Sequence, residues 1–174
     1  MIYYQDKAIR IRPMIESDIA YFTDAFLQLG WDDRRATLAS YFSEQSDASR
    51  AVLVAECREE PVGYVTLLPC AQGGPFVGKG LPEIKDFNVL PPFRQRGIGS
   101  RLMDCVEALA KKQSEHVTLA VGLYAGYGPA QRMYVKRGYI PDGSGLWHGE
   151  RHLEPYEDCR NDDALNLYFI KRLA

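Results

Sequence analysis

A glycine- and arginine-rich loop is the first feature of this sequence that points to chemistry. Residues 89–103 read VLPPFRQRGIGSRLM and lead from an apolar run into a helical pattern. The guanidinium groups of Arg94 and Arg96 suit phosphate oxygens, and the amides at a helix N-terminus attract anions. Gly97 and Gly99 allow close approach to the backbone, because glycine has no Cβ. The loop therefore predicts a phosphate-binding turn; the alternative is a plain strand-to-helix connection with solvent-facing arginines.

Two common nucleotide-binding patterns fit this sequence poorly. A dinucleotide-binding G-x-G-x-x-G motif that starts at Gly97 would need glycine where the chain has Leu102. The stretch GGPFVGKG has the glycine and lysine spacing of a P-loop, but Gly80 stands where that motif requires Ser or Thr. A P-loop nucleotide binder is therefore the weakest of the alternatives, and a surface loop explains the stretch better.

Cysteine and histidine spacing gives little support to metal or redox chemistry. The sequence HGERH places His148 and His152 four residues apart, but its glutamate is out of order for an H-E-x-x-H site. No C-x-x-C pair occurs among the four cysteines, which are Cys57, Cys70, Cys105 and Cys159. We therefore expect reduced thiols, no bound metal and no covalent cysteine intermediate.

The composition is ordinary for a globular protein. The chain has 174 residues, of which 46% are hydrophobic and 25% are charged, and its formal net charge is −2. This length predicts a single domain over residues 1–174. The charge disfavours a nucleic-acid-binding surface, and no run reaches the ~18 apolar residues that a membrane span needs. Because the N-terminus lacks a secretion-signal pattern, we expect a cytoplasmic protein.

Hydrophobic periodicity predicts alternating strands and helices around the loop. The expected strands cover residues 8–14, 51–57, 62–68, 83–90, 117–121 and 166–173. The expected helices cover residues 15–30, 33–45, 97–112 and 129–137. The polar stretch 142–163 shows no clear period. Antiparallel strands followed by a βαβ unit predict a mixed α/β fold.

Three stretches of the chain resemble the GNAT acetyltransferase superfamily. RQRGIG, from Arg94 to Gly99, resembles its [Q/R]-x-x-G-x-[G/A] acyl-CoA loop, within a longer match, IKDFNVLPPFRQRGIGSRLM. AIRIRPMIESDI resembles its first strand and helix entry, and GPAQRMYVKRGYIPDG resembles its later tyrosine-bearing helix. The resemblance implies the GNAT fold, with a mixed sheet of about six to seven strands, splayed between the fourth and fifth, and about four helices. Residues 142–163 are longer than the family's link between its last two strands.

The resemblance also implies the activity and the cosubstrate. Family members transfer an acetyl group from acetyl-CoA to a primary amine by direct attack in a ternary complex, and a small molecule or a peptide is the expected acceptor here. Backbone groups of Phe87, Asn88 and Val89 would face the pantetheine arm, and one amide would stabilise the thioester oxyanion. The expected pyrophosphate-binding residues are Arg94, Gln95, Arg96, Gly97, Ile98, Gly99 and Ser100.

Acetyl transfer to an amine also needs two proton transfers. The departing thiolate gains a proton, and the resemblance places Tyr134 at the CoA sulfur as its donor or hydrogen-bond partner. The alternative is a core aromatic residue. An alkyl ammonium, with a pKa of about 10.4, must lose a proton before attack. Glu83 is the implied base, because it precedes Arg94 at about the family's offset; Asp86 or a water chain is the alternative.

Strand alternation separates the two candidate bases. It predicts Glu83, Lys85, Phe87 and Val89 on one face of their strand, with Asp86 on the other.

The acceptor is the least defined part of the hypothesis. By resemblance, the two N-terminal helices and the Trp31–Asp33 connection would form one wall of its cleft. A cationic amine would also be attracted by aromatic and acidic residues near the C-terminus, unless these belong to a plain surface loop. They are Trp147, Glu154, Tyr156, Glu157, Asp158, Asp162 and Asp163. A non-catalytic acyl-CoA-binding or sensor module is the main alternative function, and a homodimer is compatible with the resemblance.

Overall fold

The computed structural model describes residues 1–174 as nine strands, four α-helices and three short 3₁₀-helices. The strands form one mixed sheet in the order β1-β2-β3-β4-β5-β6-β9-β7-β8. The sheet has more strands than the six to seven predicted, because β1 (Tyr4–Gln5) and β8 (Arg151–His152) are too short to produce a hydrophobic period. No helix has the length and apolar character that crossing a membrane requires.

The chain divides into two compact units that interleave along the sequence. The first contains Met1–Leu67 and Asp86–Leu109, and the second contains Leu68–Lys85 and Ala110–Ala174. The strand β5 (Glu83–Val89) contributes residues to both units.

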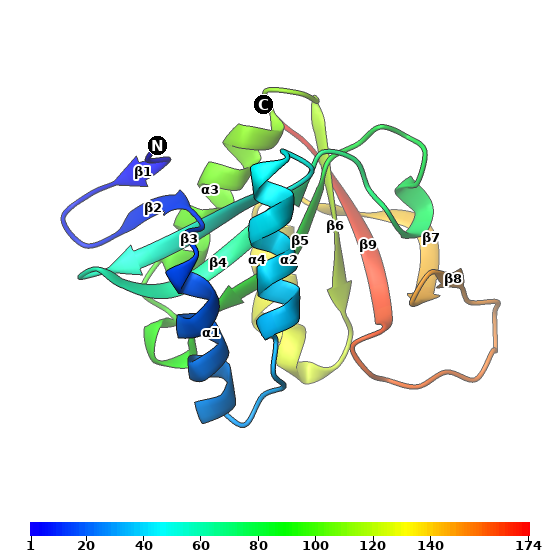
Figure 1. The fold of residues 1–174 in the computed structure, drawn as a ribbon. Coiled ribbons are helices and arrows are strands. Elements are labelled where there is room, and N and C mark those ends of the chain that lie inside the picture. The colour runs from blue at the N-terminus through cyan, green and yellow to red at the C-terminus, as the bar shows by residue number, and fades with distance from the viewer. The chain divides into compact units, whose positions relative to one another are not determined.

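Helices cover both faces of the strands in the first unit. Figure 1 shows α1 and α2 in front of β3 and β4, with α3 behind them. The front layer is held by a core that includes Met14, Phe22, Phe26, Leu38, Val52, Val54 and Tyr64. The bounds of these elements are β2 Arg10–Pro13, α1 Ser17–Gln28, α2 Arg35–Ser46, β3 Ala51–Cys57, β4 Glu60–Leu68 and α3 Ile98–Ala110.

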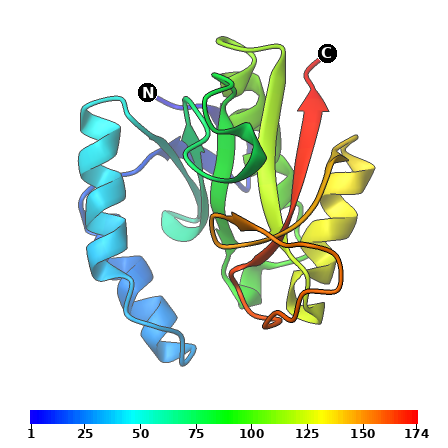
Figure 2. The same ribbon diagram turned by 90° about the vertical axis from the view of Figure 1, so that its right-hand side faces the viewer.

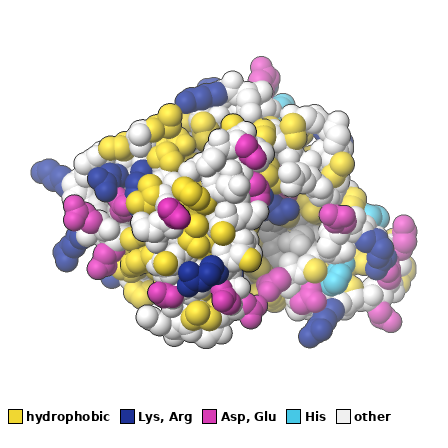
Figure 3. All heavy atoms as spheres, viewed as in Figure 1, with side chains coloured by type: hydrophobic (Ala, Val, Ile, Leu, Met, Phe, Trp, Pro, Cys, Tyr) yellow, Lys and Arg dark blue, Asp and Glu magenta, His cyan; other side chains and the backbone are white.

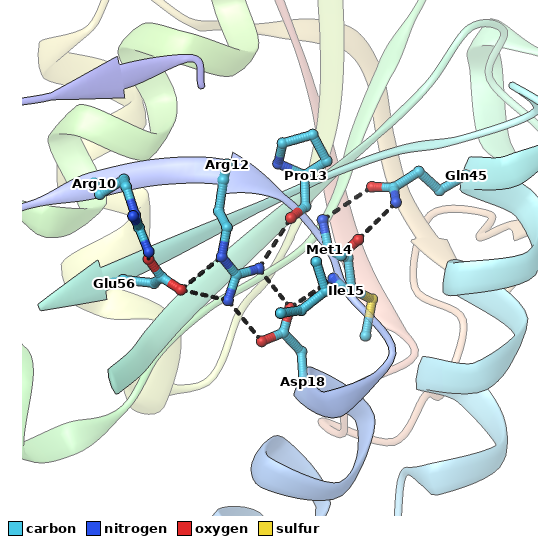
Figure 4. Close-up of polar contacts among 8 residues, drawn as sticks. All are labelled: Arg10, Arg12, Pro13, Met14, Ile15, Asp18, Gln45 and Glu56. Atoms are coloured by element: carbon cyan, nitrogen blue, oxygen red, sulfur yellow. Dashed lines mark hydrogen bonds and ion pairs between the residues drawn. The ribbon is translucent and has the colours of Figure 1, made fainter. Parts of the chain in front are cut away.

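A buried ion-pair network fixes the start of α1 to β2 and β3 (Figure 4). Arg12 Nε donates to Glu56 Oε1 at 2.6 Å, and two other guanidinium nitrogens donate to the carboxylate of Asp18 at 2.7 and 2.9 Å. The side chains of Arg12, Asp18 and Glu56 are only 11%, 1% and 6% exposed. Because each carboxylate is paired, the network brings charge into the interior without leaving either acid uncompensated.

A side-chain amide attaches α2 to the same junction. Gln45 Oε1 accepts from the amide of Met14 at 3.1 Å, and Gln45 Nε2 donates to the carbonyl of Met14 at 2.9 Å (Figure 4). Both main-chain groups of Met14 are therefore used where β2 ends and α1 begins. The two N-terminal helices are thus anchored by specific polar contacts as well as by the core.

The second unit is built on β6 (His116–Gly122) and β9 (Leu165–Arg172), which pair antiparallel along their length. Figure 2 shows the loop 69–82 and α4 (Gly128–Lys136) on opposite faces of these strands. The strand β7 (Ile140–His148) pairs with β9 and extends into the stretch where we found no period. Gly143 and Gly145 have positive φ there, and the register shifts between Pro141 and Leu146, so strand alternation is interrupted.

The parallel ladder between β5 and β6 is very short. Only Glu83 with Thr118 and Ile84 with Leu119 are in register. These are the fourth and fifth strands of the sequence prediction, so the predicted splay between them is confirmed. Asp86 adopts φ 50° two residues after the last pair, which takes β5 out of a regular extended path.

Candidate active site

The loop before α3 forms a concave set of backbone amides. Gln95 and Gly97 have positive φ angles of 60° and 80°, whereas the φ angle of Arg96 between them is not positive. Such an alternation turns successive backbone amides toward one point. The first bond within α3 runs from the amide of Arg101 to the carbonyl of Gly97 at 3.1 Å. In an α-helix the positive end of the helix dipole lies at the amides of the first turn.

The two glycines of the loop have different roles. A Cβ on Gly97 would find no atom within 4 Å, so the space in front of it is open to a ligand. A Cβ on Gly99 would lie 3.1 Å from Phe87 Cζ, so this glycine allows α3 to pack closely on β5. Gly97 therefore fits an anion cradle, whereas Gly99 serves packing.

The loop arginines also differ in their contacts. Arg94 Nε donates to the carbonyl of Val89 at 2.8 Å, which ties the loop to the end of β5. The guanidinium of Arg96 lies 5.5 Å from the centre of the Phe93 ring and is exposed. Of the two, Arg96 is the better placed for a phosphate, because its side chain makes no main-chain bond that a ligand would displace.

Close backbone contacts hold the end of β5 against β4. A Cβ on Gly63 would lie 2.6 Å from the carbonyl oxygen of Asn88 and 3.1 Å from Val89 Cα. The amide of Leu90 donates to the carbonyl of Val62 at 2.9 Å. Gly63 is thus required by the approach of the two strands, and the sequence alone gave no signal that distinguished it from other strand glycines.

The alternation predicted along 83–89 is interrupted at Asp86. Asp86 and Asn88 both contact Tyr64 of β4, while Phe87 and Val89 both approach Gly99 of α3. These two pairs lie on opposite faces, as expected. However, Asp86 has a left-handed conformation, which interrupts the extended backbone between Glu83 and Lys85 on one side and Phe87 and Val89 on the other. Glu83 is buried and Lys85 is exposed.

Asp86, the alternative base, is the acceptor of a dense polar cluster. Arg34 donates to its two carboxylate oxygens at 3.0 and 2.5 Å. Tyr64 donates its hydroxyl proton at 3.1 Å, and Asn88 Nδ2 donates at 2.7 Å. Burial, followed by the charge of Asp86, raises the pKa of Tyr64 well above its ordinary value, so the phenol remains a donor. These contacts hold the carboxylate of Asp86 in place from three side chains.

Sequence reasoning missed Arg34 and Tyr64. They lie 52 and 22 residues from Asp86 along the chain, so no local pattern connects them with it.

Tyr134 lies on α4 in the second unit and is 6% exposed. Its ring meets that of Tyr139 edge to face, with centroids 5.7 Å apart. Burial raises the pKa of Tyr134 above its ordinary value, so the phenol is protonated at neutral pH. A protonated phenol can donate to a thiolate, and a buried ring also suits a core position. Both interpretations of Tyr134 are compatible with this environment.

Glu83 is also in the second unit, where it is 4% exposed. It stands opposite Thr118 in the parallel ladder. Burial raises the pKa of Tyr168 to about 12, with the charge of Glu83 as the next cause, which indicates that the two groups are near each other. Glu83 is therefore a buried carboxylate whose charge acts on the phenol of Tyr168.

The aromatic and acidic residues near the C-terminus are largely engaged with one another and with nearby bases. Asp163 accepts from the hydroxyls of Tyr124 and Tyr127 at 2.7 and 2.8 Å. Other pairs in the segment are His148 with Asp162 at 3.1 Å and Arg151 with Glu157 at 2.5 Å. Figure 3 shows basic, acidic and histidine side chains mixed over β8 and the segment that follows it. Asp162, Asp163 and Glu157 therefore each have a partner within the protein.

Comparison with known proteins identifies the family. The sequence profile described as the Acetyltransferase (GNAT) family matches residues 12–139, which is more than half of the chain. The protein therefore belongs to the GNAT family of acetyltransferases. No curated protein sequence is significantly similar to it.

Solved structures share the fold at low sequence identity. An acetyltransferase from Salmonella typhimurium that modifies the N-terminal serine of 50S ribosomal subunit protein L7/L12 has a TM-score of 0.73 and 10% identity, with 100% of both chains covered. The structure of yncA from the same organism, with its cofactor acetyl-CoA, has a TM-score of 0.68 and 15% identity. The match covers 97% of this chain and 95% of the yncA chain. An aminoglycoside 6′-N-acetyltransferase complexed with coenzyme A has a TM-score of 0.67 and 15% identity. The match covers 94% of this chain and 97% of the other.

Proposed function

We propose that this protein moves the acetyl group of acetyl-CoA to a primary amine of a small molecule or peptide, by direct attack in a ternary complex. The observation that carries the proposal is the amide cradle before α3, open in front of Gly97. Membership of the GNAT family supports it, as do the structures with similar folds that contain coenzyme A or acetyl-CoA.

In this proposal the pyrophosphate of acetyl-CoA binds to the amides from Gln95 to Ser100. Phosphate groups bind readily where backbone amides of a turn and a helix dipole coincide. Arg96 adds a charge at the edge of the cradle, and Arg94 keeps the cradle attached to β5. The side chain of Ile98 is buried in the core and anchors the turn there.

The pantetheine arm would then run along the end of β5. The family resemblance assigns the donor to the thioester carbonyl to Phe87, Asn88 or Val89, and the amide of Leu90 that follows them is bonded to the carbonyl of Val62. A fixed backbone amide stabilises a developing oxyanion without having to reorganise during the reaction.

An amine panel tests the proposed activity. Wild-type protein is mixed with acetyl-CoA and with polyamines, aminoglycosides or peptides that have a free N-terminus, and free thiol is measured over time. Amine-dependent thiol release, with acetylated product confirmed by mass spectrometry, is the expected result. Binding of CoA without turnover on any amine would instead support an acyl-CoA-binding module.

Tyr134→Phe is expected to lower kcat about 10²-fold, the usual effect of removing a general acid, with a smaller change in KM. The ring and its packing on Tyr139 are retained, so the loss would come from the hydroxyl. Tyr139→Phe is the matched control, because it removes a hydroxyl from the other ring of the same pair. An unchanged turnover rate in Tyr134→Phe would assign that tyrosine to the core.

Glu83→Gln is expected to move or flatten the acid limb of the profile of kcat/KM against pH. A base must be deprotonated to accept the proton of the amine, so activity falls on the acid side as the base is protonated. Glutamine preserves the volume of this buried side chain. An unaltered profile would transfer the role to a water chain or to Asp86.

A further inference from the structure

We propose that Arg34 is a positioning residue that acts through Asp86. Its ion pair holds Asp86 in the left-handed conformation, and this conformation sets the direction of the amides of Phe87, Asn88 and Val89. The inference rests on the proposed function only in assigning these amides to the thioester; the effect of Arg34 on the backbone does not depend on it.

The conformation of Asp86 needs such support. A non-glycine residue at φ 50° is uncommon, and it persists where surrounding contacts determine it. Arg34 contributes a two-point contact at 3.0 and 2.5 Å, which fixes the orientation of the carboxylate as well as its distance. Tyr64 and Asn88 each add one donor at 3.1 and 2.7 Å. Arg34 is the only member of this cluster that binds both carboxylate oxygens.

Arg34 is itself held in place. It occupies the position immediately before α2, whose other end is attached to Met14 through Gln45. Its side chain is 29% exposed, so the pair with Asp86 is shielded from solvent more than a typical surface pair. The neighbouring Arg35 lies 3.8 Å from Asp24, and both of these side chains are largely exposed.

The residues after Asp86 have little freedom to absorb a change. Asn88 and Val89 contact Gly63 of β4, and Phe87 contacts Gly99 of α3. A different backbone conformation at Asp86 would therefore rotate the following peptide groups between two fixed neighbours. In the proposed reaction, such a rotation would misalign the oxyanion donor while the pyrophosphate cradle stays intact.

Arg34→Ala should therefore lower kcat by about tenfold or more, with the Kd for CoA within about twofold of wild type, because an interaction specific to the transition state is lost. Arg35→Ala is the matched control and should retain both values. Hydrogen exchange should be faster at the amides of residues 87–89 in Arg34→Ala than in Arg35→Ala. Equal kcat and equal exchange in the two variants would overturn the proposal.

A pair of substitutions at Asp86 separates backbone positioning from simple loss of the ion pair. Glycine adopts positive φ readily and alanine does not, although both remove the carboxylate. We expect Asp86→Gly to keep a higher kcat than Asp86→Ala, and Asp86→Gly to restore part of the activity of Arg34→Ala. Equal kcat in the two Asp86 variants, without any such rescue, would contradict the positioning role.

Two further measurements keep the test decisive. Should Arg34→Ala fail to fold, Arg34→Lys retains the charge but not the two-point geometry, and wild-type kcat and exchange in that variant would overturn the proposal. Absence of acetyl transfer by the wild-type protein on every amine would refute the proposed function alone. The exchange comparison would then still decide whether Arg34 holds the backbone at Asp86.

Discussion

Gly97→Glu is expected to abolish binding of acetyl-CoA in a protein that remains folded. The site in front of Gly97 is open, so a side chain there would enter the amide cradle, and its carboxylate would repel the pyrophosphate. We expect Kd to rise at least about 100-fold, which corresponds to about 2.8 kcal/mol. Calorimetric titration with CoA measures the loss, and circular dichroism confirms the fold.

Gly78→Glu is the matched control for this experiment. Gly78 has φ 76° and open surroundings, like Gly97 with φ 80°, but it lies in the loop 69–82. The control therefore introduces the same charge and a similar backbone strain away from the cradle, and CoA should bind it normally. Normal affinity in folded Gly97→Glu would show that the pyrophosphate binds elsewhere.

Arg12→Ala is expected to have the largest effect on stability. It would leave Asp18 and Glu56 buried without their shared partner, and breaking a buried pair in this way typically costs about 3–5 kcal/mol. Urea denaturation, with the slope compared between variants, measures the change in the free energy of unfolding. The expected result is a clear fall in the midpoint.

Arg10→Ala gives the comparison for Arg12→Ala. Arg10 also pairs with Glu56, but its side chain is 40% exposed and Arg12 would remain on the same carboxylate. We expect a loss of at most about 1 kcal/mol, as for other solvent-exposed pairs. Similar losses in the two variants would show that burial of the network does not determine its strength.

Local patterns predicted most of the elements and the position of the cradle. The strand 51–57 has the predicted bounds, and α3 begins at Ile98 as the glycine loop indicated. These features depend on hydrophobic period and on residue types that are close in sequence. The catalytic assignments of Tyr134 and Glu83 stay predictions, because they rest on resemblance and on burial.

The features that sequence reasoning missed depend on long-range contacts or on unusual backbone torsions. The local sequence predicts Asp86 as an ordinary strand residue. In the structure its φ of 50° bends the strand, and its ion pair with Arg34 fixes the carboxylate. In β7, Gly143 and Gly145 remove the alternation by which a strand is recognised. Neither torsion angles nor contacts between distant residues can be read from local composition.

The attachment of Asp163 to Tyr124 and Tyr127 has a consequence for divergence among related proteins. This one carboxylate connects the end of the 153–164 loop to the turn that leads into α4, the helix of Tyr134. Insertions or exchanges before Asp163 can therefore be accommodated without displacing that turn. Exchange of residues 153–162 is accordingly expected to leave the turn before α4 in place as long as Asp163 is kept.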